Sequence, residues 1–415
     1  MMSADAMGGF SPLGKRSPAT FRALRHRDYR LLWMGLAVSA VGTWMQIVAL
    51  SLLVLKITHG SALALGTVSL AQALSFFFFA LLGGSVADRI DKRRLLLFTQ
   101  STSAGLAILL GVLTGAGLIH FWMILVISFV NGTVLSFDQP ARGALVPVLV
   151  PKEDLMNAIS LQSAVFNGAS AIGPALAGFA IGLIGYAGNF FLNGASFVGV
   201  LIALYVMRVP PQAMRRQSTS QAIRESLATV RRDQVLPWVL GGYGALLFFG
   251  PSASLILPVY AVKVLHIGPE RLGLLFSSVG LGSILGALIV ASLGPNAAKG
   301  RIFLLGIVIW VGALASFAVS TWLWLSMAAL FVSGLGHIFA GATTITLLQT
   351  RVPEGMRGRV MSLNTLLIMG VRPLGDFPAG ALVSLIGAPV TVLLSAGLVG
   401  AYGLVAVARP AIRSA

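Results

Sequence analysis

The chain of 415 residues lacks cysteine altogether and carries little charge. The absence of cysteine excludes disulfides, thiolate metal sites and a cysteine nucleophile. Only 10% of the residues are charged, whereas a typical soluble domain has about 25%. A chain with so few charges cannot cover itself with polar surface, so its solvent is largely lipid.

Acidic residues are the scarcer charge, with 12 Asp and Glu against 29 Lys and Arg. Binding of nucleic acid would need a basic face on a soluble fold, and the composition excludes such a fold. In a membrane protein, an excess of cations indicates cytoplasmic loops that face anionic lipid. We therefore expect membrane lipid as a partner and no nucleic acid.

Motifs for enzymes and for secretion are also missing. The chain has no phosphate-binding loop, no H-E-x-x-H and no G-x-S-x-G, and residues 1–30 lack the apolar core of a signal peptide. An intramembrane enzyme would need a nucleophile and a base at one depth, and the only acid expected at mid-depth is Asp376. We therefore expect no enzyme, no cofactor and no metal site, with an ion gradient as the source of energy.

Hydrophobic sequence is abundant, at 57% of the residues with a mean hydropathy of +0.90. A helix that crosses a bilayer needs about 20 mostly apolar residues. Membrane strands are excluded because the apolar runs are too long and do not alternate with polar residues. The pattern predicts an all-α membrane protein with twelve transmembrane helices, at 31–55, 62–86, 95–117, 120–139, 156–183, 187–207, 235–260, 271–293, 301–319, 321–348, 360–384 and 389–408.

The positions of Lys and Arg predict the orientation of these spans. If the N-terminus is cytoplasmic, almost every cation falls in a cytoplasmic segment, and only Lys56, Lys263 and Arg271 lie outside. One further cation, Arg372, falls inside a span. Because cytoplasmic loops are enriched in Lys and Arg, both termini are predicted to be cytoplasmic.

An internal repeat divides the chain into two halves of the same orientation. Residues 150–185 align without gaps to residues 352–387, and the shared residues include the glycine pairs Gly168/Gly370, Gly173/Gly375, Gly178/Gly380 and Gly185/Gly387. Parallel six-helix repeats are one known plan for transporters, with the substrate path between them. The predicted organisation is a leader (1–30), a six-helix bundle (31–207), a cytoplasmic linker (208–234), a second bundle (235–408) and a tail (409–415).

The stretch GGSVADRIDKRRL, residues 83–95, is a dense charge cluster between two hydrophobic blocks. It resembles the loop G-x-x-x-D-R-x-G-R-K between helices 2 and 3 of the major facilitator superfamily, with Asp91 where a glycine is usual. The segments FRALRHRDYRLLW, PARGALVPVLVPKEDLMNAISL and VPEGMRGRVMSL resemble a branch of that family with enterobactin-type siderophore exporters and macrolide efflux pumps. The resemblance implies a monomer in the bacterial cytoplasmic (inner) membrane.

The same charged stretch suggests a conformational latch. By the resemblance, Asp88 would cap a helix of the opposite half, and the neighbouring cations would pair with an acid at the inner end of helix 4. Such contacts form only when the inner ends of the halves are close, so they would favour one of two states. The alternative is that the cations only anchor the loop inside. The candidate latch residues are Asp88, Arg89, Lys92, Asp138 and Arg142.

The stretch GASAIGPALAG in the fifth span resembles the exporter motif G-x-x-x-G-P-x-x-G-G of the same family. Small residues let helices approach closely in lipid, and a proline weakens the local backbone ladder. Plain helix packing explains the motif equally well. Its candidate residues are Gly168, Gly173, Pro174 and Gly178.

Polar residues at membrane depth are few, and they either join helices or face the substrate. Helices 1, 4 and 10 line the cavity in the family, which places Gln46, Asn131 and His337 first. A buried histidine can equally be a neutral structural residue. The candidate cavity residues are Gln46, Gln72, Asn131, Asn167, His337 and Asn364.

Two charges, Arg372 and Asp376, are predicted inside the eleventh span. They stand four residues apart, so they share one helix face and should pair. The aligned residues of the other half are Ser170 and Pro174, so the repeat does not require the pair. A conformational change that separates the two charges would bind or release a proton. The alternative is a static pair that holds helix 11 against helix 2.

Together these features predict a secondary transporter, a proton-coupled exporter of drug-like or siderophore-like small molecules that works by alternating access. One alternative is a lipid or lysophospholipid flippase, which would need lateral entry between helices 5 and 8 or 2 and 11. Another is a membrane sensor or receptor, which would bind a small molecule without net flux.

Overall fold

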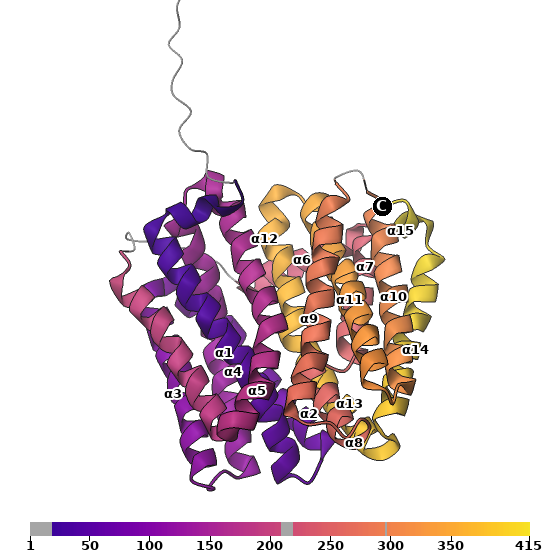
Figure 1. Cartoon of the computed structure of the whole chain (residues 1–415). Helices are drawn as coiled ribbons and strands as arrows, with labels where there is room; N and C mark the ends of the chain where they lie inside the picture. The colour runs from indigo at the N-terminus through magenta and orange to yellow at the C-terminus, as the bar shows by residue number, and fades with distance from the viewer. Residues whose placement is uncertain (1–18, 209–218, 295–296) are drawn as a thin grey trace, which may run out of the picture.

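The computed structural model describes residues 19–208, 219–294 and 297–415, apart from some side chains that include those of Asp88 and Arg89. The described chain is helical throughout, which confirms the all-α prediction. The N-terminal and C-terminal halves stand side by side (Figure 1). The N-terminal half contains η1 (Ala19–Arg25), α1 (Arg27–Ile57), α2 (Ala62–Arg89), α3 (Lys92–Gly115), α4 (Phe121–Leu149) and α5 (Lys152–Val206).

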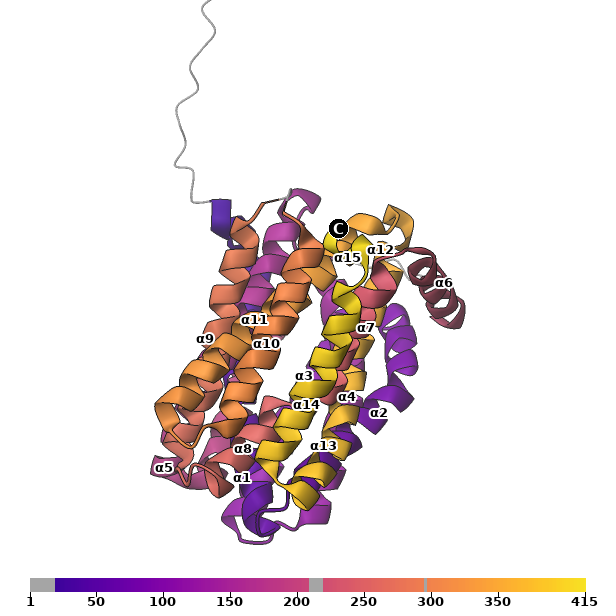
Figure 2. The same cartoon turned by 90° about the vertical axis from the view of Figure 1, so that its right-hand side faces the viewer.

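The C-terminal half follows a connecting helix, α6 (Thr219–Arg232), which lies within the predicted linker. Figure 2 shows α6 beside the bundle, near α12. The polarity of the linker did not predict this helix. The half contains α7 (Leu236–Phe249), α8 (Ala253–Lys263), α9 (Pro269–Ser292), α10 (Lys299–Val319), α11 (Leu323–Arg351), α12 (Glu354–Leu366), η2 (Leu367–Val371), α13 (Arg372–Ile386), α14 (Ala388–Val407) and α15 (Pro410–Arg413).

Within the described ranges, eleven helical segments are long and apolar enough to cross a membrane. One of them is α5, whose 55 residues would extend about 80 Å at 1.5 Å per residue. That length is far more than the roughly 30 Å of a bilayer core. The chain turns at Gly185, which has a φ of 68° that suits glycine. The segment therefore supplies the two predicted spans 156–183 and 187–207.

The turn at Gly185 has a counterpart in the second half. Gly387, which the repeat aligns with Gly185, joins α13 to α14 with a φ of 85°. The same residue type, in the same region of backbone conformation, ends the same helix in both halves. The structure thus has the same turn at the two positions that the sequence alignment pairs.

We call the side that carries η1, α6 and α15 the terminal face, and the side where α3 connects to α4 and α13 connects to α14 the far face (Figure 1). The two halves meet between the middle of the molecule and the far face. There α5 packs on α9, and α2 packs on α13. These are helices 5 with 8 and 2 with 11 when the spans are counted along the chain.

Glycines bring these helices together. A Cβ atom on Gly178 of α5 would lie 2.5 Å from the Pro269 carbonyl oxygen, and one on Gly380 of α13 would lie 2.6 Å from the Ala62 carbonyl oxygen. No side chain fits at such distances, so the backbones are in contact. Close approach through small residues is how helices associate strongly in lipid.

Two spans of the C-terminal half are irregular. The seventh span breaks between α7 and α8 at Gly250–Ser252, and Ser252 caps α8 by accepting the Leu255 N–H. The eleventh span contains the π-helical segment η2, which ends at Val371, two residues before Pro373. Proline has no N–H to donate, so the backbone ladder cannot continue regularly there. Both breaks lie near the predicted charges Arg372 and Asp376.

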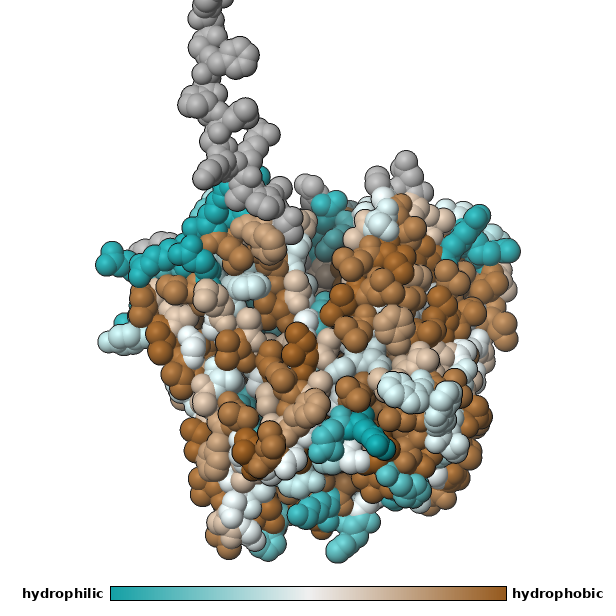
Figure 3. Space-filling view, in the orientation of Figure 1, coloured by the Kyte–Doolittle hydropathy of each residue, from teal (hydrophilic) through white to brown (hydrophobic). Residues whose placement is uncertain are grey.

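The outer surface has the pattern expected of a protein in lipid. Figure 3 shows hydrophobic side chains over much of the visible face, with hydrophilic ones gathered along its upper and lower parts. Large apolar side chains such as Leu183, Phe98 and Leu404 are exposed. Contiguous apolar surface of this kind in a helical bundle indicates contact with lipid tails.

Candidate transport site

Two adjoining cavities lie along the boundary between the halves. The first, of about 320 Å³, is lined mainly by α1, α2, α3 and α4 of the N-terminal half. The second, of about 200 Å³, is lined by α5 and by helices of the C-terminal half. Trp44 and Phe166 line both cavities and form an edge-to-face ring pair with centroids 5.8 Å apart. This aromatic pair marks the junction of the two spaces.

The first cavity is rich in amides and hydroxyls. Three of the candidate residues, Gln46, Gln72 and Asn131, line it. The Gln46 side-chain oxygen accepts a hydrogen bond of 2.7 Å from the Asn193 amide of α5. Gln46 therefore both joins two helices and faces the cavity, so the two interpretations of a buried amide are compatible here.

The second cavity is more apolar and holds the candidate groups Asn167, His337 and Arg372. The centroids of the His337 and Tyr243 rings lie 6.0 Å apart. The remaining candidate, Asn364, is buried and lines neither cavity. Its place in the prediction came from its depth along the span, and depth does not tell which side of a helix a residue occupies.

Asp376 is 3% exposed and bound by the start of α8. One carboxylate oxygen accepts the Ser252 backbone N–H at 2.9 Å, and the other accepts the Ser252 hydroxyl at 2.8 Å. The N-terminus of a helix favours a negative charge because its N–H groups are unpaired and its dipole is positive. The break in the seventh span thus creates a binding place for a carboxylate.

A short line of hydroxyl groups leads from this carboxylate to the first cavity. The Ser252 and Ser254 hydroxyl oxygens are 2.9 Å apart, and Ser254 lines that cavity. Asp376 is therefore two hydrogen bonds from the Ser254 hydroxyl at the cavity wall. This arrangement connects a buried acid to water-accessible space.

The prediction that Arg372 and Asp376 pair directly is wrong for this conformation. Among the described side chains, no ion pair within 4.0 Å joins them. Asp376 is held by Ser252 instead, while Arg372 lines the second cavity. The spacing of four residues places both on one side of α13, but the partner of the carboxylate comes from 124 positions away.

The latch residues that the structure describes lie within the N-terminal half. Asp138 is buried, forms an ion pair with Arg142, and accepts hydrogen bonds from Thr99 at 2.9 Å and Gln100 at 2.6 Å. Lys92 is the first residue of α3 and is partly exposed. The side chains of Asp88 and Arg89 lie outside the described residues, so the latch itself stays a prediction.

Asp91, the departure from the family loop, has a clear local role. It caps α3 by accepting the Arg94 N–H at 2.8 Å. An aspartate at this position satisfies a backbone donor that the start of a helix leaves free. The turn is thus closed by a side chain where the family pattern has a glycine.

The glycine motif of α5 divides into residues that pack closely and one that does not. A Cβ atom on Gly173 would lie 2.9 Å from the Val41 carbonyl oxygen of α1, and Gly178 contacts α9. Pro174 is buried, and its carbonyl oxygen is 2.5 Å from the position of a Cβ on Gly273. Nothing lies within 4 Å of such an atom on Gly168, so the expectation of close packing is wrong at that position.

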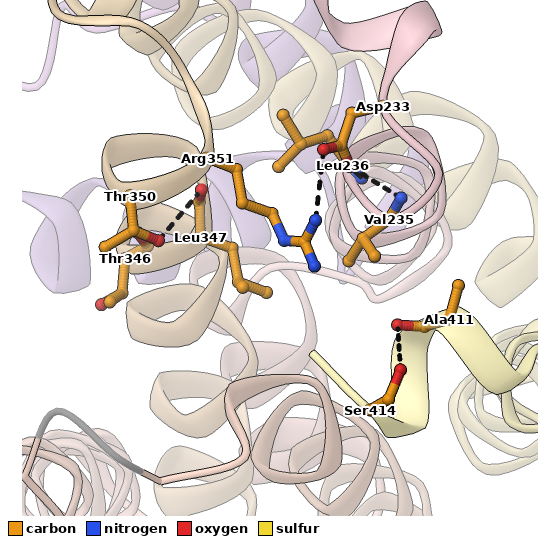
Figure 4. Close-up of polar contacts among 9 residues, drawn as sticks. All are labelled: Asp233, Val235, Leu236, Thr346, Leu347, Thr350, Arg351, Ala411 and Ser414. Atoms are coloured by element: carbon orange, nitrogen blue, oxygen red, sulfur yellow. Dashed lines mark hydrogen bonds and ion pairs between the residues drawn. The ribbon is translucent and has the colours of Figure 1, made fainter.

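Ion pairs at the terminal face were not predicted from the sequence. Asp233 accepts the backbone N–H groups of Val235 and Leu236 at the start of α7 and pairs with Arg351 at 3.3 Å (Figure 4). Burial of the Asp233 carboxyl acts to raise its pKa, but the Leu236 and Val235 N–H groups and Arg351 outweigh it and hold the pKa below 3.8. These contacts join the ends of α7 and α11 within one half.

The leader carries the corresponding contact in the N-terminal half. Asp154, near the start of α5, is bound by His26 at 2.9 Å and by Arg22 at 3.2 Å. The Ala23 N–H donates to the Asn157 side chain at 2.9 Å. The segment before the first span is therefore fastened to α5.

Comparison with solved structures defines the class of the fold. The chain superposes on a variant of the nucleoside transporter NupG with a TM-score of 0.75 over 92% of this chain and 99% of that one, at 13% identity. A bacterial homologue of the lysosomal transporter Spinster, inward-facing and occupied, gives a TM-score of 0.73 over 92% and 97%, at 13% identity. The chain therefore shares the fold of these membrane transporters.

Comparison of sequences places the chain within that class. The family described as transmembrane secretion effector matches residues 18–414, and the chain belongs to this family. The enterobactin exporter EntS of Citrobacter koseri is 27% identical over 391 residues, which cover 92% of this chain and 90% of the relative. EntS of Salmonella typhimurium is 27% identical over 387 residues, with coverages of 92% and 90%. The protein is a membrane transporter of small molecules and not an enzyme.

Proposed function

We propose that the protein is a proton-coupled exporter of small, partly apolar molecules, and that Asp376 carries the proton. The observation behind this proposal is the buried Asp376 carboxylate, bound by Ser252 beside the two cavities. Burying an ionisable group in a membrane is costly, so such a residue is by default a functional candidate. Its repeat partner is Pro174, which has no ionisable group.

The Ser252 and Ser254 hydroxyls would pass the proton between Asp376 and the first cavity. Hydroxyl groups both donate and accept, so a line of them can transfer a proton stepwise. In this proposal the proton enters Asp376 from one side of the membrane and leaves it from the other. The substrate occupies the cavities that contain Gln46, Asn131 and His337.

Direction and orientation are parts of the same proposal. The Lys and Arg distribution supports a cytoplasmic terminal face in the inner membrane of a bacterium, as a monomer with alternating access. The packed seams α5–α9 and α2–α13 then lie toward the outside, which would make this conformation inward-facing. The names of the enterobactin-exporting relatives support export.

The α5–α9 and α2–α13 contacts are also where a lipid flippase would need lateral entries. Here the helices are packed against each other through glycines.

The test of coupling is flux into inside-out vesicles under an imposed pH gradient, with enterobactin and a panel of amphipathic compounds. Wild-type protein should accumulate substrate faster when the vesicle interior is acidic. Asp376→Asn should leave binding of the substrate within about tenfold, roughly 1.4 kcal/mol, and abolish the acceleration by the gradient. The matched control is Asp233→Asn, which changes a hydrogen-bonded carboxylate far from the cavities and should keep the acceleration.

The outcomes separate the parts of the proposal. If Asp376→Asn couples flux to protons at the wild-type ratio, the carrier must be sought at Asp138 or His337. If overexpression in cells raises uptake down an imposed proton gradient, the protein is an importer and the export proposal is wrong.

Orientation is tested separately by labelling. The chain has no cysteine, so single cysteines can be placed at the exposed positions Ser414, on the terminal face, and Lys263, near the far face. In intact cells, an impermeant maleimide should label Lys263→Cys and spare Ser414→Cys. The reverse pattern, or labelling of both from outside, would contradict a cytoplasmic terminal face.

A further inference from the structure

The second cavity is lined by a cation that forms no direct ion pair among the described side chains. Arg372 lines it, and within the described part of the chain no acid lies within 4.0 Å of its guanidinium. Asp138, which lines the first cavity, pairs with Arg142, and Asp376, four residues from Arg372 on α13, is bound by Ser252. Neither of them is therefore paired with Arg372 in this conformation.

The surroundings of Arg372 suit an anionic group on an apolar molecule. Asn167 and Ser170 of α5 line the same cavity, and Ser170 is the repeat partner of Arg372. The Asn167 amide can donate hydrogen bonds, whereas the Ser170 hydroxyl donates to the Asn167 carbonyl oxygen at 2.7 Å. The Trp44–Phe166 ring pair bounds the same space. A guanidinium binds carboxylates and sulfonates through two parallel hydrogen bonds, and these strengthen where water is excluded.

We propose that Arg372 binds an acidic group of the transported molecule, whose apolar or aromatic body lies against Trp44 and Phe166. The substrate class is then amphipathic organic anions. This inference rests on the proposed function in that the cavities are taken as the transport path. It depends neither on the direction of transport nor on Asp376 as the proton carrier. An inside-negative membrane potential also favours the outward movement of an anion.

Binding of a matched pair of probes to the purified full-length protein in nanodiscs tests the proposal. The probes are 1-naphthoic acid, which is ionised at neutral pH, and 1-naphthamide, which has the same ring and no charge. Wild-type protein should bind the carboxylate at least about tenfold more tightly, or roughly 1.4 kcal/mol. Titration calorimetry with empty nanodiscs as the reference removes the contribution of partition into lipid.

Variants show whether Arg372 causes the preference for the carboxylate probe. Arg372→Gln should bind both probes about equally, while Arg372→Lys, which keeps the charge, should retain most of the preference for the carboxylate. Lys152→Gln removes an exposed cation that lines neither cavity and should behave as wild type. Thermal unfolding of each variant shows whether it is folded.

Two results would overturn the proposal: equal or absent binding of the carboxylate by wild-type protein, or an unchanged preference in a folded Arg372→Gln. Failure of the proposed function would give a different pattern of results from failure of the anion site. If vesicle flux shows no proton coupling while the carboxylate preference depends on Arg372, only the coupling proposal fails. If proton-coupled flux is limited to neutral compounds and the preference is absent, only the anion site fails.

Discussion

The two halves of the molecule share their packing positions and differ in their chemistry. Gly178 and Gly380 occupy equivalent positions and each brings two helices into backbone contact across the boundary between halves. Four residues before these glycines the halves diverge, because Pro174 stands in one and Asp376 in the other. The repeat therefore keeps the glycines that pack the halves together toward the far face, and it differs at the residues beside the cavities.

The divergence extends to the helix that faces the acid. The first span is the single helix α1, whereas the equivalent seventh span is broken into α7 and α8. The break exposes the Ser252 N–H and hydroxyl to Asp376. One half thus contributes a polar, amide-rich wall, and the other contributes a buried acid with its binding place.

The largest effect is expected from the glycines that the halves share. Gly178→Ala and Gly380→Ala each place a methyl group against a carbonyl oxygen of the opposite half. Overpacking costs about 1–3 kcal/mol, which corresponds to a roughly 5- to 150-fold shift of a two-state equilibrium. Transport rates in vesicles should decrease by a factor within this range for both variants. Gly168→Ala, where nothing lies within 4 Å, is the control and should stay near wild type.

The comparison of the halves predicts that Gly178→Ala and Gly380→Ala slow transport to a similar extent, and unequal losses would contradict it. A strong effect at Gly178 with a wild-type rate at Gly380 would mean that the α2–α13 seam does not have to close during transport. Quantifying both variants by fluorescence-detected size exclusion excludes a loss of folded protein as the cause.

A smaller effect is expected at the serines found only beside the broken span. Ser252→Ala removes the hydroxyl hydrogen bond to the buried carboxylate but keeps the backbone N–H, so it should cost about 0.5–1.5 kcal/mol of unfolding free energy. Ser254→Ala leaves Asp376 bound and interrupts the line of hydroxyls, so it should slow proton-driven flux with little loss of stability. Thermal unfolding and vesicle flux measured side by side separate the two effects. Equal behaviour of both variants in both assays would contradict a relay.

The smallest effect concerns the terminal-face pair of the C-terminal half. The pKa of Asp233 is held below 3.8, so its contacts stabilise the fold above that pH and lose their contribution as the pH falls through the lowered value. Arg351→Gln should lower the unfolding free energy by roughly 0.2–1 kcal/mol at neutral pH, because the pair is partly exposed. Thermal unfolding between about pH 7 and pH 3 should show a smaller acid-induced loss in the variant. An identical pH profile would mean that the backbone N–H groups alone set the pKa.

Much of the fold could be predicted from the sequence because the constraints are local. Apolar runs of sufficient length become spanning helices wherever lipid is the solvent. The repeat aligns Gly185 with Gly387, and the structure places both at turns with positive φ, a backbone conformation that suits glycine. The amides at Gln46, Gln72 and Asn131 line the first cavity, but their depth along the spans does not by itself determine the side of the helix that they occupy.

Only the tertiary structure decided the partners of the charges. The spacing of Arg372 and Asp376 predicted that they share one side of α13, and from this a direct pair was expected. Gly250, Pro251 and Ser252 mark a local helix break and an N-cap, but they do not show which acid the freed Ser252 N–H binds. A hydrogen bond between positions 252 and 376 depends on how two separate spans pack, and residues so far apart leave no periodic signal in a single sequence. Composition and periodicity therefore determined the helices and the repeat, while long-range packing determined which acid is held by Ser252 and which cation faces the cavity.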